Sequence, residues 1–343
     1  MAKLFKRKEV ETASMDAAEN AIANKEVEGL SQRQIVIKRF IHHRAAMIAL
    51  FSLILITLIV NTALEFKIGP WKIHGWWKYK VTDIPELRYK ECPGQVIGCP
   101  TLKLFPPSLG EHPFGQDDIG RDYLALVMRG AQRSLMVAFV IGVLGGVIGT
   151  IVGAISGFYR GVVDSVLMRL VDFVITVPAI IIGSVIGYRY GNLGAGFLAI
   201  YLGLFSWTGL SRLVRGEFLK LREMEFVDAA RVAGASNRRI IFKHILPNAV
   251  GIIIVSVTLL MSSAILLETA LSYIGFGVVA PDVSLGLLIS TYQDSFTSRP
   301  FLFWWPGFFI ISIALSINFI GDGLRDAFDP RQRRRVSRKE RGK

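Results

Sequence analysis

The chain has 343 residues, of which 52% are hydrophobic and only 20% are charged, and its mean hydropathy is +0.44. This composition is too apolar for an ordinary soluble domain and is typical of membrane proteins. A net charge of +13 would also suit a nucleic-acid-binding protein, so the positions of the charges decide between these classes.

Six apolar runs are long enough, or nearly so, to cross a hydrocarbon core, which takes about 20 helical residues. We therefore predict an all-α membrane protein with six transmembrane helices. The third run is the least regular, because Asp172 interrupts it and Arg169 precedes it. The first run begins too far along the chain, and is too long, for a cleaved signal peptide. The runs are Ala45–Leu64, Ser134–Gly157, Leu170–Gly187, Leu193–Leu210, Ala249–Leu267 and Phe301–Ile320.

The basic residues are distributed unevenly around these runs. With a cytoplasmic N-terminus, 28 of the 40 Lys and Arg residues fall on the cytoplasmic side, and the short outer loops carry only Arg189 and Arg299. Loops rich in Lys and Arg stay in the cytoplasm, so this asymmetry places both termini there. The basicity reflects topology, and no aromatic-interleaved basic face accompanies it. We expect a lipid membrane as the surroundings and no nucleic acid as a partner.

The same pattern divides the chain into five segments. A polar cytoplasmic tail without an apolar stripe is predicted to be flexible. The next segment begins with alternating basic and apolar residues, which suit either a helix on the membrane surface or a plain basic anchor for the first span. One long extracytoplasmic loop, a five-helix core and a basic cytoplasmic tail follow. The five segments are 1–32, 33–64, 65–133, 134–321 and 322–343.

The extracytoplasmic loop contains the only two cysteines, Cys92 and Cys99. Six residues separate them, in a compartment that permits oxidation, which favours a local disulfide. Closing so short a loop contributes roughly 2–3 kcal/mol in the chain-entropy account. A metal-binding pair is the alternative, although no histidine or further cysteine is close in sequence.

The second run has glycines at steps of three and four residues. Small residues on one helical face let another helix approach closely, which matters where packing rather than hydrophobicity holds helices together. The partner helix can belong to the same chain or to another subunit, and the sequence leaves both open. The predicted packing residues are Gly142, Gly146, Gly149 and Gly153, with Gly145 and Gly157 alongside.

Motifs of catalysis are absent from the sequence. It has no phosphate-binding G-x-x-x-x-G-K-[ST], no H-E-x-x-H and no G-x-S-x-G, so we predict no catalytic residues and no metal site. Two acidic residues are placed where a membrane would make them costly. Asp172 follows Arg169 at a spacing that suits a local ion pair. Glu268 ends the fifth run, where it either faces a substrate cavity or sits at the membrane interface.

A charged segment, 212–247, lies between the fourth and fifth runs and is predicted to form a helical hairpin. Arg215–Val232 is rich in good helix formers. Gly234 suits a left-handed C-cap, and Ser236 can cap a second short helix. Pro247 fits the first turn of the next span, where its missing N–H costs nothing. A polar hairpin held at a membrane surface is a contact site for another protein.

This hairpin resembles the cytoplasmic signature of the membrane subunits of ATP-binding-cassette importers. That signature is Glu-Ala-Ala, three residues, Gly, nine residues and Ile-x-Leu-Pro. Here it corresponds to Asp228-Ala229-Ala230, Gly234 and His244-Ile245-Leu246-Pro247. Asp228 and His244 depart from the usual glutamate and isoleucine. The stretches HPFGQDDIGRDYLALVMRGAQRSL (112–135) and NFIGDGLRDAFDPR (318–331) are similar to the C-type subunit of oligopeptide and dipeptide permeases.

The resemblance covers roughly 33–335 and implies a type I importer permease fold in the bacterial inner membrane. It implies as partners a homologous second permease subunit, two ATPase subunits that carry ATP and Mg, and an extracytoplasmic peptide-binding protein. No cofactor is expected on this chain. The implied ATPase-coupling residues are Glu225, Asp228, Ala229, Ala230, Gly234, Leu246 and Pro247.

Other functions remain open from the residues alone. A sibling importer for nickel, glutathione or oligosaccharides is the nearest alternative, because substrate choice lies mostly in the binding protein. A membrane-embedded enzyme would need converging ionisable or nucleophilic residues. A self-sufficient channel or carrier would need polar residues along several spans, or inverted repeats with broken helices. The sequence shows neither pattern.

Overall fold

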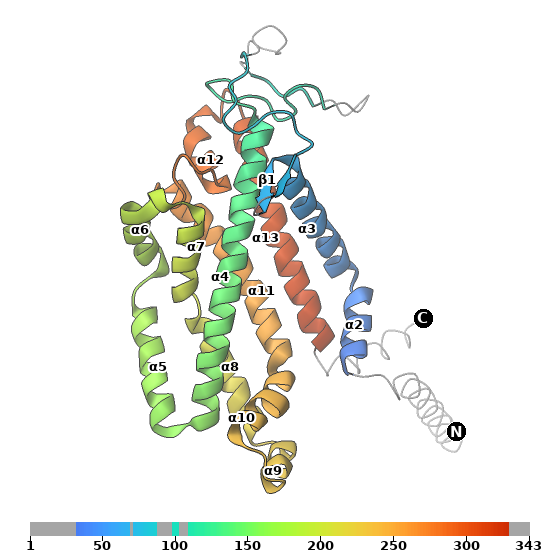
Figure 1. Cartoon of the computed structure of the whole chain (residues 1–343), viewed down its shortest axis with the longest axis vertical. Coiled ribbons are helices and arrows are strands. Elements are labelled where there is room, and N and C mark those ends of the chain that lie inside the picture. Colours follow the sequence, from blue (N-terminus) through green and yellow to red (C-terminus); the bar gives the residue numbers. More distant parts are fainter. Residues whose placement is uncertain (1–31, 69–70, 88–97, 103–108, 329–343) are drawn as a thin grey trace, which may run out of the picture.

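The computed structural model describes residues 32–68, 71–87, 98–102 and 109–328. These residues form one elongated helical bundle (Figure 1), and the only sheet among them is an antiparallel hairpin of Phe66–Ile68 (β1) and Trp71–Ile73 (β2). We call the end that carries 65–122 the outer end and the opposite end the inner end. The helices are α2 (Gln32–His42), α3 (Arg44–Ala63), α4 (Tyr123–Tyr159), α5 (Gly161–Thr176), α6 (Ala179–Tyr190), α7 (Ala195–Phe205), α8 (Thr208–Arg222), α9 (Glu225–Val232), α10 (Asn237–Arg239), α11 (Leu246–Tyr273), α12 (Leu285–Tyr292) and α13 (Phe301–Phe328), with 3₁₀ turns at Gly191–Leu193 and Gln293–Ser295 and a π-helical segment at Ile240–Ile245.

Five helical stretches are long and apolar enough to cross a membrane, and a bent pair of helices can supply a sixth span. The pair joins α5 to Ala179–Leu193 with a bend of 68°. The prediction of a continuous third span is therefore wrong. Pro178 breaks it, because proline has no N–H to donate and favours an extended residue before it, here Val177 at φ −92° and ψ 120°. The five single stretches are Arg44–Ala63, Tyr123–Tyr159, Ala195–Arg222, Asn237–Tyr273 and Phe301–Phe328.

Two helices extend beyond their predicted ends. α4 begins at Tyr123, inside the predicted loop 65–133, because Asp122 caps it by accepting a hydrogen bond from the Ala125 N–H at 2.9 Å. α13 continues to Phe328, inside the predicted tail 322–343. Its last turns pack on the N-terminal helices: Gly323 lies against Ala46, and the Arg39 guanidinium donates to the Ala327 carbonyl at 3.4 Å.

The glycine face of α4 packs inside the subunit. Gly142 and Gly146 lie against Met261 and Val257 of α11, while Gly149 and Gly153 lie against the backbone and side chains at the start of α8. A methyl group on any of the four would overlap its neighbour. These residues therefore serve intramolecular packing, and in this structure they do not form a surface for another subunit.

Buried polar groups attach the segment 65–122 to the outer end of the bundle. The Asp122 carboxylate accepts a hydrogen bond from Trp77 Nε1 at 2.7 Å and contacts His112 Nδ1 at 2.8 Å. The side chains of Asp122 and His112 are both buried. The Asp117 carboxylate accepts from Arg121 Nε at 2.6 Å and from the Tyr292 hydroxyl at 3.0 Å. Burial beside Asp117 raises the pKa of Tyr292, so this hydroxyl stays protonated and acts as the donor.

The predicted disulfide falls only partly on residues that the structure describes. Cys99 is disulfide-bonded, and Cys92, the only other cysteine of the chain, lies outside the described residues.

Candidate functional site

The predicted hairpin forms the tip of the inner end, where α9 projects beyond the long helices (Figure 1). The predicted continuous helix over Arg215–Val232 is wrong, because α8 ends at Arg222 and α9 begins at Glu225. Met224 between them is extended, at φ −86° and ψ 146°. This turn folds α9 back so that Val227 reaches the same apolar cluster as Phe218 of α8.

The glycine turn after α9 follows the prediction. Gly234 has φ +77°, and the Ala235 N–H donates to the Ala230 carbonyl at 3.0 Å, which closes the helix end. Ser236 then caps the next helix by accepting from the Arg239 N–H at 3.4 Å. A side chain with a Cβ adopts this left-handed conformation only at a cost, so glycine suits the position.

The second helix of the hairpin is not a separate short helix as predicted. α10, the π-helical segment and α11 run on as one stretch, Asn237–Tyr273. Pro247 lies in the first turn of α11, as predicted. Just before it the helix widens, and the Leu246 N–H bonds to the Ile241 carbonyl five residues earlier. A π-turn accommodates a residue that cannot donate within a continuous helix.

The predicted coupling residues divide between two faces. Glu225, Asp228, Ala229, Gly234 and Pro247 are exposed, Leu246 is half-buried, and Ala230 is buried. Ala230 and Val227 pack with residues of α8 and the π-helical segment, including Leu221, Ile240 and Ile245. Ala230 therefore holds α9 in place and does not offer its side chain to another protein.

Apolar side chains that sequence reasoning missed surround the exposed face. Val232 is 90% exposed and Phe242 is 65% exposed, with Met224 and Phe226 exposed nearby. On the same face Asp228 and Arg231 form an ion pair at 2.8 Å. Clustered exposed apolar groups on a polar element mark a contact surface for another protein. The signal lay in the sequence, as isolated apolar residues on the polar side of a short helix.

Arginine contacts connect the hairpin to the rest of the bundle. Arg215 of α8 makes two hydrogen bonds of 2.6 Å each to Asp164 of α5. Arg160, between α4 and α5, pairs with Glu223 at 2.5 Å. The bidentate geometry of Arg215 and Asp164 is the strong form of this interaction. This pair therefore ties α8 to α5 at the inner end.

Asp172 also contributes to this connection. It pairs with Arg212 of α8 at 2.5 Å, so the predicted local pair with Arg169 is wrong. α5 and α8 lie side by side at the inner end, which brings Arg212 within reach of Asp172. Tertiary packing of this kind is not visible in the spacing of residues along one helix.

Glu268 does not face a cavity in this structure. It is 0% exposed and accepts hydrogen bonds from Ser134 Oγ at 2.8 Å and Ser272 Oγ at 2.7 Å. The carboxyl group therefore joins α4 to α11 inside the subunit. The side chain is buried in this chain and not at an exposed interface, and a role for Glu268 in a substrate pathway stays a prediction.

Comparison with known proteins identifies the family. Residues 149–334, which include the whole hairpin 212–247, match the family described as binding-protein-dependent transport system inner membrane component. Among curated relatives, the oligopeptide transport system permease protein OppC of Escherichia coli K12 is 38% identical over 319 residues, covering 93% of this chain and 97% of the relative. OppC of Mycobacterium tuberculosis H37Rv is 36% identical over 304 residues, covering 88% and 96%.

A solved structure of an inward-facing MetNI methionine ABC transporter has a similar fold. The TM-score is 0.50 at 20% sequence identity, over 60% of this chain and 96% of that chain. This likeness supports the fold alone, while the family match and the close relatives cover most of the sequence. The chain therefore belongs to the family of inner membrane components of binding-protein-dependent transport systems.

Proposed function

We propose that this chain is a permease subunit of an ATP-driven importer for oligopeptides or dipeptides. The observation that carries the proposal is α9, an exposed contact element whose buried residues Val227 and Ala230 pack on α8, while Arg215 of α8 pairs with Asp164 of α5. The names of the relatives support the substrate class, since both OppC proteins are described as oligopeptide permeases.

The proposal includes four other subunits. A homologous permease subunit completes the transmembrane pathway, two ATPase subunits dock at the inner end, and an extracytoplasmic binding protein delivers the peptide. ATP and Mg belong to the ATPases, because this sequence has no phosphate-binding loop. The proposal places the chain in the bacterial inner membrane with both termini, and α9, in the cytoplasm, as the distribution of Lys and Arg favours.

The proposed mechanism is rigid-body transmission. Closure of the ATPase pair shifts α9, whose exposed face sits in a groove on one ATPase. The buried face of α9 moves α8 with it through the cluster around Phe218 and Val227. Arg215 then carries the shift to α5 through Asp164, and the close glycine contacts carry it to α4. Packed elements of this type move as units, so a small shift reaches the membrane pathway.

The test is affinity purification of the tagged chain from its native membrane in mild detergent, with mass spectrometry of the retained proteins. We expect a second permease-like subunit and ATPases. The Asp228→Lys variant should retain less ATPase, because the substitution reverses a charge on the exposed face of α9 while the fold beneath is unchanged.

Asp294→Lys is the matched control, because Asp294 is exposed at the outer end and should leave ATPase retention unchanged. Recovery of the chain alone, or only with copies of itself, would contradict the proposal and favour a self-sufficient channel or carrier.

A further inference from the structure

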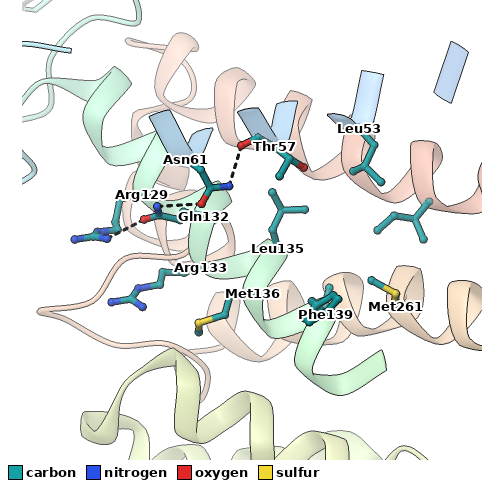
Figure 2. Close-up of a pocket in the computed structure, with 12 residues that line it drawn as sticks. Leu53, Thr57, Asn61, Arg129, Gln132, Arg133, Leu135, Met136, Phe139 and Met261 are labelled. Carbon is teal, nitrogen blue, oxygen red and sulfur yellow. Dashed lines mark hydrogen bonds between the residues drawn. The ribbon is translucent and has the colours of Figure 1, made fainter. Parts of the chain in front are cut away.

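A cavity of about 450 Å³ lies between α3 and α4 near the outer end. One end of it is polar and the other apolar, as Figure 2 shows: the guanidinium groups of Arg129 and Arg133 point to the same side, away from Phe139 and Met261. An amphipathic cavity of this kind selects a ligand with a polar head and an apolar body. The lining residues are Leu53, Thr57, Asn61, Leu135, Met136 and those just named, with Gln132, Ala138 and Ile317.

A chain of hydrogen bonds orients the polar end. Asn61 donates to the Thr57 carbonyl at 2.8 Å and accepts from Gln132 Nε2 at 3.3 Å. Gln132 in turn accepts from Arg129 Nη1 at 2.8 Å. The amide of Gln132 is neutral, so this bond leaves the charge of Arg129 uncompensated. Across the part of the chain that the structure describes, no carboxylate lies within ion-pair distance of Arg129.

Arg133 differs, because its Nε donates to Asp282 Oδ1 at 2.9 Å. The two arginines together with one carboxylate leave one positive charge at the mouth of the cavity. Arginine binds phosphate oxygens through paired N–H donors, so a phosphate group is the complementary partner.

The position of the cavity indicates where such a phosphate comes from. Arg129 is six residues into α4, roughly 9 Å along a helix that rises about 1.5 Å per residue, and Asn61 is near the end of α3. Both polar groups thus lie close to the outer boundary of their spans, at the level of lipid headgroups. Leu53, Phe139 and Met261 lie deeper, at the level of acyl chains.

The surfaces beside the cavity are apolar and exposed. On α4 the lining residue Phe139 is 60% exposed, and Val143 and Val147 follow it on the same helical face; on α3 Leu58, next to the lining residue Thr57, is 57% exposed. A pathway for a hydrated peptide would carry polar side chains, whereas faces of this composition contact hydrocarbon. The cavity therefore opens toward lipid.

We propose that this cavity binds an anionic phospholipid of the outer leaflet. The phosphate pairs with Arg129, and one acyl chain lies along Leu53, Leu135 and Phe139. The lipid fills the space where α3 and α4 separate. This binding is independent of the proposed transport of peptides.

The test is native mass spectrometry of the complete chain, with any subunits that purify with it, in an equal mixture of phosphatidylglycerol and phosphatidylcholine. The natural chain should retain phosphatidylglycerol preferentially. Arg129→Gln should reduce that preference about tenfold, the loss expected for one charge-assisted hydrogen bond. Arg189→Gln is the matched control, because Arg189 is an exposed arginine at the outer end of α6 and should have no effect.

Thr57→Trp tests the apolar part of the cavity. Thr57 is exposed and lines the cavity, so the larger side chain fills the space without entering the core, and retention of both lipids should fall. Equal retention of phosphatidylglycerol by Arg129→Gln and the natural chain would overturn the proposal. So would displacement of the lipid by excess glycerol 3-phosphate, which would assign the site to a soluble phosphate, or displacement by peptide, which would assign it to the transport pathway.

Discussion

At the scale of single residues, Asp122 performs two tasks at once. Its carboxylate caps α4 at the Ala125 N–H and also holds Trp77 and His112 of the preceding segment. The side chain is 0% exposed, so water cannot replace a lost partner. A buried carboxylate with several hydrogen bonds is costly to disrupt, because its partners are left unpaired.

We predict that Asp122→Ala lowers the free energy of unfolding by about 2–4 kcal/mol, the range for a helix cap combined with a buried charged pair. Unfolding of the purified chain in detergent, titrated with SDS, measures the effect. Glu111→Gln is the control, because its pair with Lys78 at 3.3 Å is largely exposed and should contribute less than about 1 kcal/mol. Equal effects of the two substitutions would contradict the capping role.

At the scale of elements, the close contact between α4 and α8 depends on glycines, which have no side chain. A methyl group at Gly153 would overlap the Ser211 carbonyl oxygen and Val214, and one at Gly149 would meet Leu210. Backbone atoms cannot rotate away as a side chain can. Gly149 and Gly153 therefore set the distance between α4 and α8.

Gly153→Ala should destabilise the protein by about 1–3 kcal/mol, the usual cost of overpacking. The matched control is Gly216→Ala on α8, where an added methyl would meet nothing within 4 Å. It should be neutral or stabilising by up to about 1 kcal/mol, because alanine favours helix more than glycine does. SDS-titrated unfolding of both variants provides the comparison, and a neutral Gly153→Ala would show that α8 adjusts freely.

The turn at Gly234 permits a second comparison between elements. Gly234 has a φ of +77°, and a Cβ at this position would meet no other atom within 4 Å. The only cost of a larger residue here is therefore the strain of the left-handed backbone conformation. Gly234→Val should therefore distort α9 through backbone strain, costing roughly 1–2 kcal/mol or more. Gly234→Asn should be tolerated, because asparagine adopts this conformation more readily.

In membrane vesicles with the partner subunits, Gly234→Val should lose peptide uptake while membrane insertion and ATP hydrolysis persist. The Asn variant should retain both activities. Uptake by the Val variant at the level of the natural chain would show that the turn does not contribute to coupling.

At the scale of the whole molecule, the two ends of the bundle are built from different interactions. At the outer end the carboxylates of Asp117 and Asp122 and the imidazole of His112 are buried, whereas the acidic partners of the inner-end arginines, Asp164 and Glu223, are partly or largely exposed. The outer end thus fixes Trp77 and His112 to the start of α4, and the inner end presents a surface. This difference fits the proposed mechanism, in which the inner end receives the shift from an ATPase.

The orientation of the molecule is tested with single cysteines. Ile119 is 52% exposed at the outer end and Val232 is 90% exposed at the inner end. In intact cells, a membrane-impermeant maleimide should label Ile119→Cys. It should label Val232→Cys only after the membrane is permeabilised, because the distribution of Lys and Arg places α9 inside. The reverse pattern would overturn the proposed topology.

Local features of the sequence predicted much of this fold. Apolar run length found five of the spans, and capping chemistry predicted the turns at Gly234 and Ser236 and the place of Pro247. These properties depend on adjacent residues alone. Pro178 was visible in the sequence too, but the prediction of the third run did not take it into account.

The missed features depend on contacts between distant residues. The burial of Glu268 depends on Ser134, far away in the chain, and the pair of Asp172 depends on Arg212 of another helix. α12, a short helix between the last two spans, is buried by packing on α11 and α13. Spacing along one helix carries no information on such neighbours.

The bend at Pro178 gives the two halves of the third span different attachments. The inner half, α5, is linked to α8 by Arg215 and Asp164, whereas the outer half packs at Gly183 against Leu271 of α11. In the proposed mechanism, a shift of α9 therefore rotates α5 about Val177, while the outer half keeps its contact with α11. The proposed mechanism thus converts a translation at the inner end into a rotation at the bend of 68°, and leaves the packing of the outer helices intact.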